Sequence, residues 1–81
     1  MTYQRILWAI DEAAQLAAQS AVDAFGDELP SAQIAWDFLN EQLYGSGEIE
    51  RPVALPDFLP RQFKHDYRRH CRVLLAKRLA A

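Results

Sequence analysis

The chain has 81 residues, a net charge of −2 and a pI near 5.5, and 51% of its residues are hydrophobic. This length allows one domain, and the apolar content is typical of a folded protein and excludes a disordered one. The single cysteine excludes an internal disulfide, which favours a reducing compartment, the cytoplasm. No apolar run approaches the roughly 20 residues that a membrane-spanning helix needs, so we expect no membrane contact.

The first predicted element is an amphipathic helix over residues 2–25. Apolar residues recur every three or four positions, Thr2 is a candidate N-cap, and Gly26 is a candidate terminator in the left-handed conformation. A seam of small side chains lets another helix approach closely, and this helix could belong to the same chain or to a second copy in a homodimer. The seam consists of Ala14, Ala17, Ala18 and Ala21.

A second helix is predicted over residues 31–44, with Ser31 as its N-cap and Gly45 just past its end. Its apolar residues cover well over half of the helix circumference. A helix of this kind is expected to lie between two neighbours, with Trp36 in the core.

Residues 45–57 form a proline-rich segment that is predicted to cross in an extended conformation to the last helix. We favour a crossover packed on the core, and the alternative is a binding loop. The last helix is predicted over residues 58–79, with Asp57 as its cap and a buried stripe that includes Phe63, Tyr67 and Cys71. The fold class is therefore all-α, a single domain of three helices with one long crossover between the second and the third.

Charge is divided unequally along the sequence. Residues 1–50 contain nine acidic residues and one basic residue, a net charge of −8, whereas residues 51–81 contain eight basic and two acidic residues, a net charge of +6. Wound as a helix, five cations of the last helix share one face: Arg61, His65, Arg68, Arg69 and Arg72. This face is a candidate for nucleic-acid contact. We favour instead a face that is solvated or paired with acids of the same fold, including Asp11, Asp37 and Glu41.

No pattern in the chain predicts catalysis, a cofactor or a metal. His65 and His70 are five residues apart, which puts their rings about 140° apart around a helix, so they cannot share one ion. Asp66 and His70 are four residues apart, and we expect them to form a local pair. Cys71 lies at the centre of the buried stripe and is predicted to be a core residue and not a nucleophile. We therefore expect a protein that is not an enzyme.

Trp8 is an anomaly, because it projects from the polar face of the first helix. It either packs under the crossover, which we favour, or anchors a partner. The candidate protein-interface residues lie on this face and on the second helix: Trp8, Glu12, Gln15, Gln19, Asp37 and Glu41.

The leading hypothesis is a small helical binding protein, an adaptor or an inhibitor, that associates stoichiometrically with a protein partner. The acidic first half favours a partner with a basic surface, such as one that handles nucleic acid. An inhibitor of a defence system, encoded by a phage or a plasmid, is one version of this hypothesis, although no motif carries such a resemblance. The alternative is a nucleic-acid-binding domain that uses the basic face of the last helix.

Overall fold

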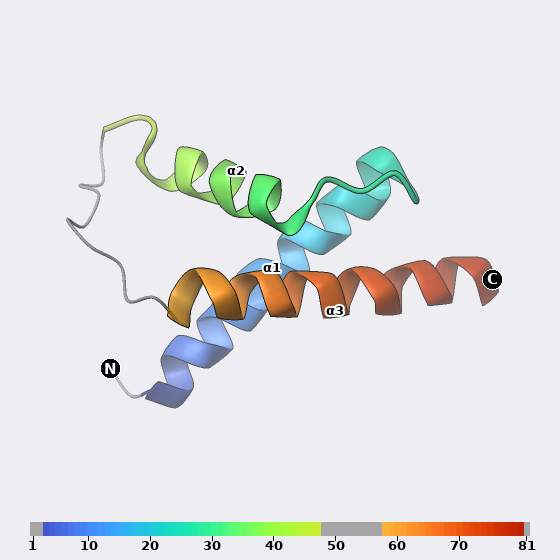
Figure 1. Ribbon diagram of the computed structural model, residues 1–81, viewed down its shortest axis with the longest axis horizontal. Coiled ribbons are helices and arrows are strands. Elements are labelled where there is room, and N and C mark those ends of the chain that lie inside the picture. Colours follow the sequence, from blue (N-terminus) through green and yellow to red (C-terminus); the bar gives the residue numbers. More distant parts are fainter. Residues whose placement is uncertain (1–2, 48–57, 81) are drawn as a thin grey trace.

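The computed structural model describes residues 3–47 and 58–80, and it contains three helices: α1 (Tyr3–Phe25), α2 (Ala32–Tyr44) and α3 (Phe58–Ala80) (Figure 1). The all-α prediction is confirmed. Each helix begins and ends within one residue of the predicted range. The two predicted caps Thr2 and Asp57, and residues 48–57 of the predicted crossover, lie outside the described residues.

Local signals account for where α1 ends and α2 begins. Gly26 has a φ of 66°, which a side chain would disfavour, and its N–H donates to the carbonyl of Val22 at 2.9 Å. Ser31 has an extended backbone, and its hydroxyl accepts a 3.2 Å hydrogen bond from the N–H of Ile34. Both residues therefore act as the sequence predicts, as a helix terminator and an N-cap.

The core lies where α1 and α3 cross (Figure 1). On α1, Ala14, Ala18 and Ala21 of the alanine seam are buried, with Ala14 and Ala18 fully inaccessible, and Ala17 is partly buried. The seam contacts the large side chains of α3. Phe63, Tyr67 and Cys71 are the buried α3 residues of this core. The helix that occupies the seam is therefore α3 of the same chain.

α2 packs on α3, and two of the contacts that fix it there involve the buried α3 residues Phe63 and Tyr67. The ring of Trp36 lies 5.3 Å from the ring of Phe63, so Trp36 joins the core as predicted. The hydroxyl of Tyr67 donates a 3.0 Å hydrogen bond to the carbonyl of Pro30, just before α2. α2 makes little direct contact with α1, and Ile34 and Phe38 remain exposed. The expectation that α2 lies between two neighbours is therefore wrong for the described part of the chain.

Arg78, in the last turn of α3, donates a 2.8 Å hydrogen bond to the carbonyl of Val22, in the last turn of α1. A cation at this position also interacts favourably with the negative end of the α1 dipole. Within the described ranges, no helix is both long and apolar enough to span a membrane.

Candidate functional site

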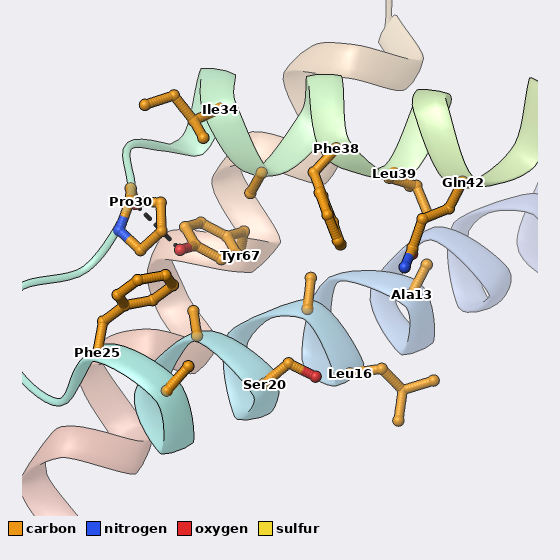
Figure 2. A pocket seen from close by; sticks show the side chains of 14 residues that line it. Ala13, Leu16, Ser20, Phe25, Pro30, Ile34, Phe38, Leu39, Gln42 and Tyr67 are labelled. Atoms are coloured by element: carbon orange, nitrogen blue, oxygen red, sulfur yellow. Dashed lines mark hydrogen bonds between the residues drawn. The ribbon is translucent and has the colours of Figure 1, made fainter. Parts of the chain in front are cut away.

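An apolar groove lies between α1 and α2, and Tyr67 of α3 contributes to its base (Figure 2). We call it the α1/α2 groove, and its volume is about 530 Å³. Fourteen residues line it: Ala13, Leu16, Ala17, Ser20, Ala21, Ala24, Phe25, Pro30, Ile34, Ala35, Phe38, Leu39, Gln42 and Tyr67. The groove exists because α2 packs on α3 and leaves the adjoining face of α1 largely uncovered.

Four large apolar side chains at the groove are more than half exposed. The exposed fractions are 65% for Leu16, 56% for Phe25, 57% for Ile34 and 63% for Phe38. Figure 2 shows Phe38 pointing from α2 toward α1, and Phe25 near Pro30 and Tyr67 at one end of the groove. Single exposed apolar residues are ordinary on a protein surface, whereas a contiguous group of them is typical of an interaction site.

The groove offers few polar groups. Among the lining residues, only Ser20, Gln42 and Tyr67 carry polar side chains, and the Tyr67 hydroxyl is already bonded to Pro30. Burial raises the pKa of Tyr67 to about 12, with the neighbouring Cys71 as a second cause. Burial also raises the pKa of the Cys71 thiol, and Cys71 is a core residue as predicted. The lining is therefore uncharged at neutral pH and suits apolar contact.

The predicted protein-interface residues are all exposed, and they divide into two groups. Trp8 is 66% exposed on α1, and Gln15 and Gln19 share its side of the helix. The part of the crossover predicted to cover Trp8, residues 48–57, is outside the described residues, so both interpretations of Trp8 stay predictions.

The acidic members of the predicted interface flank the groove itself. At 100° per residue, Glu12 lies about 40° from Leu16 around α1, and Glu41 lies about 20° from Ile34 around α2. Asp37 lies on the same side of α2, where it accepts a 2.9 Å hydrogen bond from Gln33. Gln33 in turn accepts a hydrogen bond from Lys64 of α3.

The apolar centre of this site is not among the candidate residues predicted from the sequence. Its members Leu16, Phe25, Ile34 and Phe38 read as parts of ordinary amphipathic helices. The available signal was the broad apolar arc of the second helix, which exceeds what one neighbour can cover.

The basic face of α3 is divided by the fold. Arg69 lies 2.6 Å from Asp11 of α1 and 3.8 Å from Asp66, so this cation is paired internally. Arg61, His65, Arg68 and Arg72 are exposed. Within the described residues, His65, Arg68 and Arg72 form no ion pair, and neither Asp37 nor Glu41 forms one with α3.

His70 has a different partner from the one predicted. Its Nε2 lies 2.8 Å from Asp11 across the α1–α3 interface, whereas Asp66 is buried and accepts a 3.0 Å hydrogen bond from Gln62. The prediction of an Asp66–His70 pair is therefore wrong. The reason is that the crossing of α1 over α3 brings a carboxylate from the other helix within reach of the imidazole.

Replacing Asp11 with alanine is expected to lower the free energy of unfolding by less than about 1 kcal/mol, because ion pairs at the surface contribute little. The side chains of Arg69 and Asp11 are 46% and 39% exposed, so water already solvates both charges. Urea unfolding measures the change, and Glu12→Ala is the control, because Glu12 is adjacent and forms no ion pair within the described residues. A loss of several kcal/mol with Asp11→Ala, and not with Glu12→Ala, would contradict the interpretation of the Asp11–Arg69 pair as a solvated surface ion pair.

Among the described residues, no cluster of three or more His, Cys, Asp or Glu side chains is arranged to hold a metal ion. Comparisons of the chain with protein-family models, with curated proteins and with solved structures find no match.

Proposed function

We propose that this protein is a non-enzymatic binding protein that associates stoichiometrically with a protein partner through the α1/α2 groove. The observation that carries the proposal is the group of exposed apolar side chains on both sides of an uncharged groove. Exposing such a surface costs free energy in water, and a protein partner that covers it recovers that free energy. Such a protein acts as an adaptor or an inhibitor, by occupying a surface of its partner.

The acidic first half supports a partner with a basic surface. Arg69 is engaged with Asp11, which weakens the alternative of nucleic-acid binding through α3. A free cysteine that is buried and has no possible disulfide partner in the chain supports a cytoplasmic location.

A pull-down from nuclease-treated lysate, with three forms of the protein as bait, tests the proposal. The first is the wild type, the second is Leu16→Ser with Phe38→Ser in the groove, and the third is Arg68→Gln with Arg72→Gln on α3. All four substituted residues are exposed, so we expect each variant to fold, which circular dichroism checks. The expected result is a protein in a constant ratio to the bait, recovered with the wild type and the α3 variant and lost with the groove variant.

Two outcomes would count against the proposal. Recovery of the same partner by the groove variant would show that the groove is not the binding surface. The nucleic-acid alternative is tested by a mobility-shift titration at two salt concentrations. Binding that weakens steeply with salt and is lost in the α3 variant would support that alternative instead.

A further inference from the structure

We propose that the α1/α2 groove binds an amphipathic helix of a partner protein whose apolar face is flanked by lysine or arginine. This inference rests on the proposed function, and it specifies the chemistry of the segment that enters the groove. Three features support it: the shape of the groove, the scarcity of polar groups in it and the charge along its edges.

The dimensions of the groove suit one short helix. Its lining on α1 runs from Ala13 to Phe25, a length of about 18 Å at 1.5 Å per residue, which a helix of about 12 residues matches. The α1 side consists largely of small side chains, among them Ala17 and Ala24, and these let a third helix approach closely. Leu16 from α1 and Phe38 from α2 are both exposed and line the groove, so both are available to contact the entering helix.

The scarcity of polar groups favours a helix over an extended segment. A helix satisfies its own backbone N–H and C=O groups, whereas an extended segment needs hydrogen-bond partners from the surface that it contacts. In the groove, Ser20 and Gln42 are the two polar side chains that are not already bonded in the described part of the structure. Two such groups are too few for an extended peptide of this length.

Acidic residues border the groove on both helices. On α1, Glu12 and Asp23 lie within about 40° of Leu16 around the helix axis, and on α2 Glu41 lies about 20° from Ile34. The hydrogen-bond partner of Asp23 is the neutral Gln19, at 3.0 Å. None of these three carboxylates forms an ion pair within residues 3–47 and 58–80, so lysines or arginines flanking an incoming helix would find unpaired partners.

The same charges argue against a second copy of the chain as the occupant. In a two-fold symmetric dimer that joins groove to groove, the acidic edges of one copy would face the acidic edges of the other. Like charges brought together at an interface disfavour it. Self-association through the groove is therefore the less favourable choice.

Two synthetic peptides test the inference by fluorescence anisotropy. Each is an amphipathic helix of about 14 residues with leucines spaced by three and four positions, flanked by lysines in one peptide and by glutamates in the other. The lysine peptide is expected to bind the wild-type protein about 10-fold more tightly than the glutamate peptide. The difference should shrink when salt rises from about 0.05 to 0.5 M.

Two variants separate the apolar contribution from the charged one. Glu12→Gln with Glu41→Gln should remove most of the preference for lysine and leave the apolar contribution. Leu16→Ser with Phe38→Ser should abolish binding of both peptides, and Arg68→Gln with Arg72→Gln should leave binding unchanged.

Equal affinity for the two peptides, or no binding of either one while the pull-down still recovers a partner through the groove, would overturn this inference and leave the proposed function standing. Failure of the wild-type bait to recover a protein partner, or recovery of that partner by the groove variant, would overturn the proposed function. Sedimentation of the protein alone as a dimer that Phe38→Ser dissociates would show that a second copy occupies the groove, and would also overturn the inference.

Discussion

Replacing Phe63 with alanine is expected to lower the free energy of unfolding by about 3–5 kcal/mol, the largest effect of any single substitution considered for this chain. Phe63 is 1% exposed, and its ring lies 5.3 Å from the ring of Trp36 and 6.3 Å from that of Tyr67. Its removal would leave a cavity beside α2 and weaken the contact between α2 and α3. A domain of this size has a total stability of about 4–12 kcal/mol, so the variant should lose at least about a quarter of it.

Urea unfolding followed by circular dichroism measures this loss, and Phe38→Ala is the matched control. Phe38 is 63% exposed on α2, so its truncation is expected to cost less than about 1 kcal/mol. Similar losses for the two variants would show that the groove is closed in solution and that Phe38 is a core residue. The control also matters for function, because binding experiments at the groove need variants that stay folded.

The helices were predictable because their signals are local. Ser31 and Gly26 act on backbone groups within three or four residues of themselves, so their roles follow from their neighbours in the sequence. The alanine seam was also predictable, since small residues at helical spacing permit a close helix crossing whatever the partner is. Only the identity of the partner, α3 of the same chain, required the structure.

The groove and the ion pairs were not predictable, because they depend on how the helices cross. The broad apolar arc of α2 predicts that the helix buries apolar surface. It does not show whether the other helices of this chain cover the whole arc or only part of it. Arg68 and Arg69 differ by one position, yet only Arg69 is turned toward Asp11 by the crossing of α1 and α3. The same crossing brings Asp11 to His70, so that His70 pairs with Asp11 and not with Asp66.

The stability of the protein is expected to fall steeply between pH 10 and pH 12 because of Tyr67. Burial raises the pKa of this hydroxyl from 10.0 to about 12, with the neighbouring Cys71 as a further cause. At pH 11 the unfolded chain has therefore lost the Tyr67 proton, while the folded protein retains it. Stability that is fully present below pH 10 is lost as the pH rises through 12, by on the order of 2 kcal/mol from this residue.

Urea unfolding of the wild type and of Tyr67→Phe at pH 7, 9, 10 and 11 tests this expectation, with pH values chosen on both sides of the unperturbed tyrosine pKa of about 10. At pH 7 the variant should be less stable by about 1 kcal/mol, because the Pro30 carbonyl loses its hydrogen bond. This difference should shrink and then reverse above pH 10, since phenylalanine cannot ionise. The titrating groups other than Tyr67 are common to both proteins, and of these Cys71 is coupled to the Tyr67 hydroxyl, so the difference between the two curves reports Tyr67 together with its coupling to Cys71. If the free energies of unfolding of the two proteins change in parallel from pH 9 to pH 11, the Tyr67 hydroxyl is solvated in the folded protein. Such a result would also show that this end of the groove is in contact with water.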